Sequence, residues 1–320
     1  MSGTRAGFRP QMWNCPLKRG NSSYHLSLRE VEALLEEQWG LKFSLGAISE
    51  SQAPLRQWLG PVYRQIGEAV RRSCADETRH YRNRSVYWLW TLTTDDVAYF
   101  MTHYSRGKGA AQTLLGDFQG ILMTDRHGAY NDHPEAKHQY CWAHLIRNLE
   151  RIAQCKGQAG KDGRRLLQIA RMTVHCGKRY YRSERYRRRL FWLKARFYRE
   201  LEQAARKHGD SKTGRSCRKL LDDFPRFWTF LDHPGVPMTN NAAERALRPY
   251  VIWRKKSFFS QSHRGDCFRP MILSVIETCK RLKIGVYQTL RTICAQGMCD
   301  GKVTFRLPIP EPQPLPVPNS

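Results

Sequence analysis

The chain has 320 residues, of which 41% are hydrophobic and 26% are charged. This length suffices for about two domains with a sizeable buried core, and the composition argues against a wholly disordered chain. The 54 Lys and Arg residues outnumber the 28 Asp and Glu residues, which leaves a net charge of +26 with histidine neutral. Such an excess favours contact with a phosphate polymer or an anionic membrane surface.

Neither membrane insertion nor secretion is indicated by the sequence. No apolar run approaches the roughly 20 residues of a membrane span, and the N-terminus lacks the apolar core of a signal peptide. The ten cysteines include no C-x-x-C pair, which argues against a zinc ribbon or finger. We therefore expect a cytoplasmic protein with mostly buried, reduced thiols and no membrane partner.

The two ends of the chain are expected to lack regular structure. Residues 1–25 carry Gly, Pro and basic residues without periodicity, which predicts a poorly ordered N-terminus. Residues 301–320 include proline at alternate positions near the end, which predicts an extended, polyproline-like tail.

Residues 26–70 are predicted to form a helical region. Ser27 and Glu30 have the spacing of a capping box, which opens a helix. Apolar residues then recur on one helical face until Gly40, a residue type that commonly ends helices.

Two further helices are expected in this region. Ser44 is placed to cap a short second helix, and Pro61 is expected to open a third. The first two helices, joined by a turn that contains glycine, are compatible with a helix-turn-helix that contacts DNA. Such pairs also occur as plain packing units, so both interpretations stay open.

Residues 71–150 are expected to form the first part of an α/β core. Four segments are rich in aromatic, β-branched or other apolar residues, as strands are. They comprise residues 71–78, 87–94, 97–104 and 121–124. Together with a short helix over residues 110–118, they predict a mixed sheet with helices packed on it.

Residues 151–235 are predicted to form a basic, helical insertion. Between Lys178 and Lys207, twelve Lys and Arg residues face three Glu residues. A solvated helix face is one interpretation, but the one-sided charge favours contact with phosphates. The candidates for this contact are Arg187, Arg188 and Arg189. Four aromatic residues could stack on unpaired bases, although core packing is their expected role. They are Tyr180, Tyr181, Tyr186 and Trp192.

Residues 236–300 are expected to complete the core with two helical regions. Asn240 or Asn241 is placed to cap the first, which Pro249 is expected to end. The second is expected over residues 268–293.

Three acidic residues suit metal-dependent phosphodiester chemistry. Two divalent metals about 4 Å apart neutralise charge on the attacking and leaving oxygens, and Mg²⁺ prefers carboxylate ligands. Asp76 lies in the first strand, Asp125 ends a buried strand, and Glu244 lies in the first turn of a helix. Simpler roles are also open, because Asp125 could cap a turn and Glu244 could pair with Arg248.

Four motifs in the same order resemble the IS66 family of bacterial insertion-sequence transposases. They are A-D-E-T at residues 75–78, T-D-R-H-G-A-Y at 124–130, Y-C-W-A-H-L at 140–145, and T-N-N-A-A-E-R-A-L-R-P at 239–249 followed by V-I-W-R-K at 251–255. The resemblance extends from about residue 26 to residue 293. Several motifs in register are far more specific than one.

The resemblance implies an RNase H-like catalytic core of the DDE type. Asp76, Asp125 and Glu244 match the three acids, which would hold two Mg²⁺ ions, with Mn²⁺ as a substitute. The implied reaction is DNA strand cleavage at the ends of an insertion element, followed by strand transfer to a target. A homo-oligomer on DNA, accessory transposition proteins and a bacterial, nucleoid-associated location are also implied.

Further residues are candidates for supporting roles. Cys141 and His144 form a C-x-x-H motif that fits either helix packing or support of the active site. Glu277 is a fallback third carboxylate, although Lys280 and Arg281 favour surface pairing instead. Basic residues beside Glu244 and after its helix are candidates for contact with the DNA backbone. They are Arg245, Arg248, Arg254, Lys255 and Lys256.

The sequence also departs from the family. Typical members have a longer N-terminal region with a Cys/His zinc-binding segment and a coiled coil, whereas residues 1–25 resemble neither. The alternative function is therefore a truncated or decayed, non-catalytic protein that binds DNA.

Overall fold

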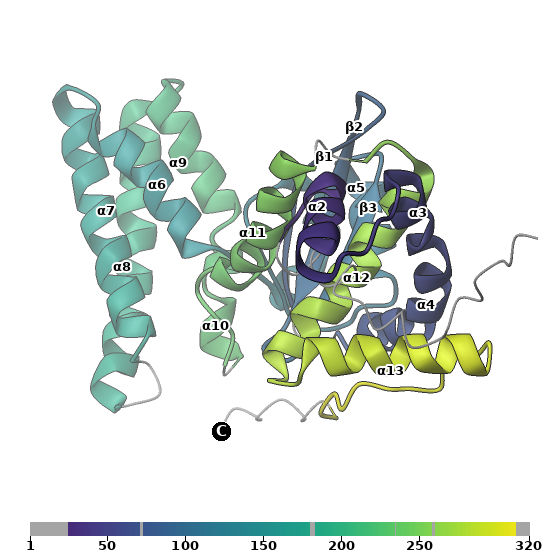
Figure 1. Cartoon of the computed structure of the whole chain (residues 1–320). Helices are drawn as coiled ribbons and strands as arrows, with labels where there is room; N and C mark the ends of the chain where they lie inside the picture. Colours follow the sequence, from purple (N-terminus) through teal and green to yellow (C-terminus); the bar gives the residue numbers. More distant parts are fainter. Residues whose placement is uncertain (1–24, 71–72, 180–182, 234, 258–259, 312–320) are drawn as a thin grey trace, which may run out of the picture. The chain divides into compact units, whose positions relative to one another are not determined.

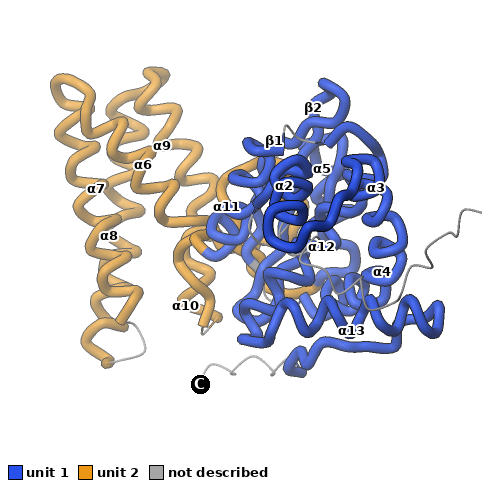
Figure 2. Tube along the Cα trace, viewed as in Figure 1, with its two compact units in different colours: residues 1–118, 242–312 blue, residues 119–241, 313–320 orange. Residues whose placement is uncertain are grey.

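The computed structural model of the protein describes residues 25–70, 73–179, 183–233, 235–257 and 260–311. The chain divides into two compact units, which Figure 2 shows in different colours. Unit 1 comprises residues 1–118 and 242–312, and unit 2 comprises residues 119–241 and 313–320. Among the described residues, no helix is both long and apolar enough to cross a bilayer.

Both chain ends fall largely outside the described residues. The poorly ordered N-terminus expected at residues 1–25 is described only at His25. Residues 303–311 of the expected proline-rich tail contain neither helix nor strand, and the rest of that tail lies outside the described part.

Three helices open unit 1: α2 (Leu28–Trp39), α3 (Leu45–Glu50) and α4 (Gln52–Glu68) (Figure 1). The expected capping box is confirmed, since Ser27 Oγ accepts the N–H of Glu30 at 3.2 Å and the Glu30 carboxylate accepts the N–H of Ser27 at 2.6 Å. Gly40 ends α2 in the left-handed region, with φ at +65°.

Helices α2 and α3 enclose a small apolar cluster formed by Val31, Leu35 and Ile48. Ser44 caps α3 as expected, because its hydroxyl accepts the N–H of Ala47 at 3.1 Å. This pair of helices has the expected packing role, and contact with DNA stays a prediction.

The helix boundaries expected at two prolines are wrong. Pro61 lies inside α4, and Pro249 lies inside α11 (Asn241–Lys256). A proline inside a helix loses one backbone hydrogen bond and costs roughly 3 kcal/mol. Burial of apolar residues after each proline offsets this cost, with Val62 and Ile66 in α4 and with Tyr250 and Trp253 in α11.

The strands of unit 1 form an antiparallel meander. They are β1 (Ser73–Arg82), β2 (Ser85–Thr93) and β3 (Ala98–His103). The register places Asp76 opposite Thr91 and Trp90 opposite Met101. Helix α5 (Lys108–Leu115) follows, so the expected strands and short helix are confirmed with shifted ends.

Two C-terminal helices occupy the place of the single helical region expected at residues 268–293. They are α12 (His263–Arg281) and α13 (Val286–Cys299). Side chains of α12 form hydrogen bonds with backbone N–H groups on the outer edge of β3. Ser274 Oγ accepts the N–H of Phe100 at 2.9 Å, and Thr278 Oγ1 accepts the N–H of Ala98 at 3.1 Å. The edge strand is therefore covered rather than open to another chain.

Unit 2 begins with two short parallel strands, β4 (Leu122–Thr124) and β5 (His138–Tyr140). Its helices are α6 (Trp142–Ala153), α7 (Gly157–Gly177), α8 (Glu184–His208), α9 (Lys212–Asp222) and the short α10 (Thr229–Asp232). Residues 151–235 are largely helical, as expected, whereas β5 is not expected from the sequence. The role of this segment as an insertion stays a prediction. The α/β class is likewise confirmed, with antiparallel pairing in unit 1 and parallel pairing in unit 2. The RNase H-like assignment stays a prediction.

A glycine permits the close approach of α6 and α7 within unit 2. A Cβ atom at Gly163 would lie 2.6 Å from the backbone nitrogen of Ala153. The apolar core of this helical part includes Leu149, Leu193 and Trp228, all of them buried.

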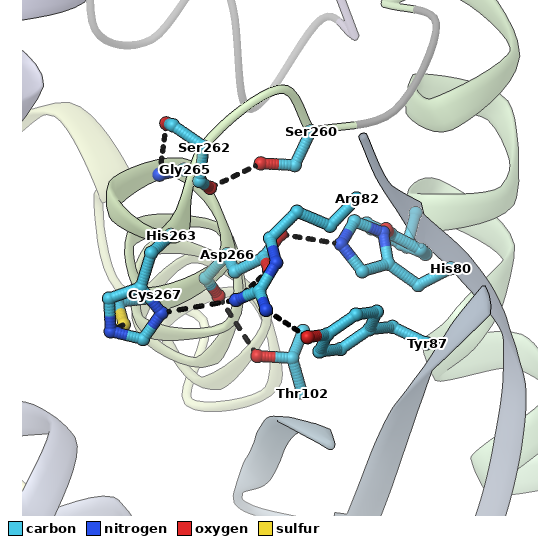
Figure 3. A network of polar contacts seen from close by, with 11 residues as sticks. His80, Arg82, Tyr87, Thr102, Ser260, Ser262, His263, Gly265, Asp266 and Cys267 are labelled. Atoms are coloured by element: carbon cyan, nitrogen blue, oxygen red, sulfur yellow. Dashed lines mark hydrogen bonds and ion pairs between the residues drawn. The ribbon is translucent and has the colours of Figure 1, made fainter. Parts of the chain in front are cut away.

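A buried polar network joins β1 to α12 in unit 1 (Figure 3). His80 is fully buried, and its Nε2 lies 2.7 Å from Asp266 Oδ1, while its Nδ1 contacts the hydroxyl of Tyr250. Arg82 lies 3.2 Å from the other carboxylate oxygen of Asp266 and contacts the hydroxyl of Tyr87. Burial lowers the pKa of His80 against the opposing effect of Asp266. The neutral ring therefore donates from Nε2 to the carboxylate and accepts the tyrosine proton at Nδ1.

A second buried histidine lies on β5 of unit 2. Burial lowers the pKa of His138 to about 3, with smaller effects from the positive charges of His133 and Arg226. The Nε2 atom of His138 lies 2.8 Å from Thr124 Oγ1. The folded protein thus keeps this ring neutral at pH values where the unfolded chain protonates it.

Acidification below pH 6.5 should therefore destabilise the fold, since the unfolded chain binds a proton at position 138 that the folded protein does not. The stabilisation from neutral His138 is complete above pH 6.5. Between pH 6.5 and pH 3 the free energy of unfolding falls by about 1.4 kcal/mol per pH unit. Urea unfolding at pH 7.5 and pH 5.0 measures it, and His138→Gln should show a shallower pH dependence than the unsubstituted protein. Equal pH dependence in the two proteins would contradict this account.

Candidate functional site

The first expected acid, Asp76, lies on β1 and is half-buried. Its Oδ1 accepts the N–H of Glu77 at 2.8 Å. The side chain of Glu77 is buried and binds Arg106, whose Nε and Nη2 lie 2.9 and 2.8 Å from Glu77 Oε1. The Arg106 guanidinium also lies over the ring of Trp88, at 4.7 Å from its centroid. The strand is thus fixed directly after Asp76 by an ionic contact and a cation–π contact.

The second expected acid, Asp125, follows β4 directly and is half-buried. Its Oδ1 accepts the N–H of His127 at 2.8 Å, which fixes the turn that leads out of the strand. This contact is the turn-capping role that the sequence left open. It engages one oxygen of the carboxylate and is compatible with a ligand at the other.

The neighbouring Arg126 anchors this strand end to the helical insertion within unit 2. Its Nε donates to Asp223 Oδ2 at 2.8 Å, and its guanidinium lies 6.0 Å from the ring centroid of Phe227. Both charged side chains are about four-fifths buried, at 21% and 22% exposure. The sequence analysis missed this pair, because no local pattern connects Arg126 with Asp223.

Cys141 connects two other segments of unit 2. Its backbone N–H donates to the carbonyl of Thr124 at 2.9 Å, directly before Asp125. Its buried Sγ accepts the N–H of Asn240 at 3.2 Å, directly before α11. In addition, the N–H of Trp142 donates to the carbonyl of Met238 at 2.9 Å. The start of α6 therefore holds both the segment that leads to Asp125 and the segment that leads toward the Glu244 helix.

The third expected acid, Glu244, lies in the first turn of α11 and is half-buried. Asn241 is the first residue of the helix, so Asn240 occupies the position before it. Asp76 and Glu244 belong to unit 1, whereas Asp125 belongs to unit 2. In the described part of the chain, no group of three or more His, Cys, Asp or Glu side chains is arranged to hold a metal ion. The metal-binding role of the three acids accordingly stays a prediction.

The basic residues expected near Glu244 differ in their surroundings. Arg245, Arg248 and Lys255 are exposed on α11. Lys256 is also exposed and lies 3.6 Å from the carboxylate of Glu30. Arg254 is half-buried and donates to Thr78 Oγ1 at 2.9 Å and to the carbonyl of Arg79. Its guanidinium therefore braces β1, and contact with DNA stays a prediction for all five basic residues.

The structure also places the two remaining candidates, Glu277 and His144. Glu277 is 7% exposed and lies 2.8 Å from Lys280 Nζ and 3.3 Å from Arg281 Nη1. The expected pairing is present, although it is buried rather than on the surface. His144 lies one turn after Cys141 on α6, and its Nδ1 is buried without a hydrogen-bond partner among the described residues.

The Cys141 thiol should protect the Asn240 amide from hydrogen exchange. Cys141→Ala removes the acceptor and should speed exchange at residue 240 about fivefold, as expected for loss of one hydrogen bond of ~1 kcal/mol. Cys141→Ser retains an acceptor and should have a smaller effect. Hydrogen–deuterium exchange followed by NMR or fragment mass spectrometry measures the change.

A buried cysteine elsewhere in unit 2 provides the control. Cys217→Ala removes a fully buried thiol from α9 and should leave exchange at residue 240 unchanged. Equal exchange rates in Cys141→Ala and the unsubstituted protein would show that the thiol does not hold this segment.

The sequence matches the family described as Transposase IS66 family over residues 21–266. It is 28% identical to the uncharacterized protein y4qI of Sinorhizobium fredii (strain NBRC 101917 / NGR234) over 253 residues, which cover 69% of this chain and 46% of that protein. It is 23% identical to the uncharacterized protein y4jD of the same strain over 309 residues, which cover 85% of this chain and 59% of that protein. The chain thus spans about half the length of these relatives. Because the family match covers well over half of the chain, the protein belongs to the IS66 family of transposases.

Proposed function

We propose that the protein is a DDE transposase, with an RNase H-like core, that cleaves DNA strands at the ends of an insertion element and transfers them to a target. The observation that carries this proposal is the family match over residues 21–266, which includes Asp76, Asp125 and Glu244 in their expected order. The three carboxylates are proposed to hold two Mg²⁺ ions, for which Mn²⁺ can substitute.

The surroundings of the acids support this assignment. All three side chains are half-buried, so each is partly accessible from solvent. Asp125 is held through one oxygen by a backbone N–H, which fixes the orientation of the carboxylate. Carboxylate oxygens are the ligands that hard divalent cations prefer. When bound, such ions supply charge neutralisation at the attacking and leaving oxygens of a phosphodiester.

The protein's own residues have the remaining roles in this proposal. Arg245, Arg248 and Lys255 are exposed around and after Glu244, and they would bind phosphates of the DNA backbone. Arg126, Cys141 and Arg254 would act as positioning residues, because they fix the backbone beside the proposed metal ligands. Element ends and target DNA are the proposed substrates, and a homo-oligomer with accessory transposition proteins is the proposed assembly.

The three acids should be essential for cleavage but not for DNA binding. Asp76→Asn, Asp125→Asn and Glu244→Gln should each lower Mg²⁺-dependent nicking by more than the 10- to 100-fold that loss of an outer-shell partner typically costs. The measurement is nicking of a labelled duplex that carries an element end, with Mg²⁺ or Mn²⁺. DNA affinity in the absence of metal should be retained, since binding depends mainly on basic residues.

Two matched controls sharpen this experiment. Asp95→Asn removes an exposed carboxylate of unit 1 and should leave nicking unchanged. Glu277→Gln tests the fallback acid and should affect stability more than the requirement for metal, because Glu277 is paired with Lys280 and Arg281. An unsubstituted protein that binds element ends but never nicks them with either metal would instead support a non-catalytic DNA-binding protein.

A further inference from the structure

Helix α8 of unit 2 has an apolar face and an opposite basic face. The apolar face is buried in the helical core and consists of Leu190, Leu193, Phe197, Leu201 and Ala204. At 100° per residue, a second set of residues points away from this face. These residues are Arg185, Arg188, Trp192, Arg196 and Arg199. We call this set the arginine–tryptophan stripe.

The stripe is a continuous line along the helix. Its members are separated by three or four residues, the spacing that places side chains on one helical face. From Arg185 to Arg199, the stripe extends over about 21 Å at 1.5 Å per residue. The stripe contains four arginines and no acidic residue, so it carries an excess of positive charge.

The local pairing of these arginines leaves most of this charge in place. Arg185 and Arg199 are exposed, and among the described residues neither has a recorded hydrogen bond or ion pair. Arg188 lies 3.5 Å from the carboxylate of Glu184, but both side chains are exposed, and such pairs contribute little. Arg187, one of the expected phosphate contacts, lies beside the stripe and also reaches Glu184 at 3.5 Å.

The aromatic residue of the stripe is not packed as expected. Trp192 is 49% exposed, so the expected core-packing role is wrong for this residue, whereas Tyr186 does pack against the core. The guanidinium of Arg196 lies 5.1 Å from the centroid of the Trp192 ring. Phe191 and Tyr198 on the same helix are 57% and 44% exposed. Tyr180 and Tyr181 lie outside the described residues.

An exposed indole within a line of arginines has the chemistry that unpaired nucleotides require. Arginines bind successive phosphates of a strand, and an aromatic ring stacks on a base whose face is free. Bases inside a duplex are already stacked on each other, so a duplex would use the arginines without the indole. Burial of a half-exposed tryptophan against a base therefore favours a single strand over a duplex.

We infer that the arginine–tryptophan stripe of α8 is a binding surface for single-stranded DNA, with Trp192 stacked on one unpaired base. The inference rests on the proposed function in taking DNA as the substrate, but it adds a surface and a strand preference. The proposed strand cleavage at element ends would supply unpaired nucleotides, and this surface would bind one such strand.

The full-length protein can be tested with a short fluorescein-labelled oligonucleotide and with its duplex. Trp192→Ala should weaken binding of the single strand about tenfold, as expected for loss of one stacked base, and leave duplex binding within about twofold. Trp192→Phe retains a ring and should restore most of the single-strand affinity. Fluorescence anisotropy measures both affinities, and circular dichroism verifies that the helical content is unchanged.

The arginines have a separate signature in the salt dependence of binding. Arg185→Gln/Arg199→Gln should reduce the slope of log K against log salt for the single strand by about 1.4, since each lost phosphate contact contributes about 0.7. The matched control is Lys161→Gln/Arg165→Gln, which removes two exposed charges from α7 and should leave the slope unchanged.

Single-strand affinity that is unaffected by Trp192→Ala would overturn the inference, as would an equal loss for single strand and duplex. If the salt-dependence slope is the same in the two double variants, Arg185 and Arg199 do not contact phosphates of the single strand. The nicking assay remains independent of these results. If single-strand binding depends on the stripe but the protein does not nick DNA with either metal, only the proposed function is contradicted. If the protein nicks DNA but the stripe variants bind the single strand normally, only the stripe inference is contradicted.

Discussion

One residue in unit 2 constrains the backbone on which two of the proposed catalytic acids depend. Cys141 donates its N–H to the carbonyl of Thr124 and accepts the N–H of Asn240 at its thiol. The first bond fixes the end of the strand that precedes Asp125, and the second fixes the segment before the helix that carries Glu244. Because the thiol is fully buried, water cannot replace it as an acceptor, and loss of the contact leaves a buried amide to satisfy. The C-x-x-H motif therefore has a physical role that does not require a metal.

Unit 1 depends on a different kind of constraint, two buried carboxylates that contact residues of β1 or lie on it. Asp266 receives a hydrogen bond from His80 and an ionic contact from Arg82, while Glu77 of β1 binds Arg106, which follows β3 in the chain. Buried charges cost desolvation energy and stabilise a fold only when their partners are in place. These contacts also specify a single arrangement, since sliding β1 by one residue would exchange the faces of Glu77, His80 and Arg82. Asp76 directly precedes the anchored Glu77 on β1, which suits the proposed role of its carboxylate.

The sequence predicts the local features of this protein and misses those that depend on distant partners. The capping box at Ser27 and the end of α2 at Gly40 are set by neighbouring residues, so their patterns suffice. Pro249 was expected to end its helix because local rules weigh the lost hydrogen bond but not the burial of Tyr250 and Trp253 beyond it. Strand β5 has only three residues and forms by pairing with β4, which no local periodicity indicates. The contact of Arg126 with Asp223 joins residues far apart in the sequence and leaves no local pattern. The order of the motifs predicts the family and the three candidate acids. The exposure of Trp192 is visible only in the structure.

The central proposal is that carboxylates from positions 76, 125 and 244 share divalent ions when DNA is bound. Anomalous X-ray scattering from crystals of the protein bound to an element end and grown with Mn²⁺ would locate such ions directly. The account predicts two manganese peaks, each within coordination distance of at least one of the three carboxylates and of the same phosphate. Manganese bound elsewhere, or carboxylates that occupy separate sites with DNA in place, would contradict it.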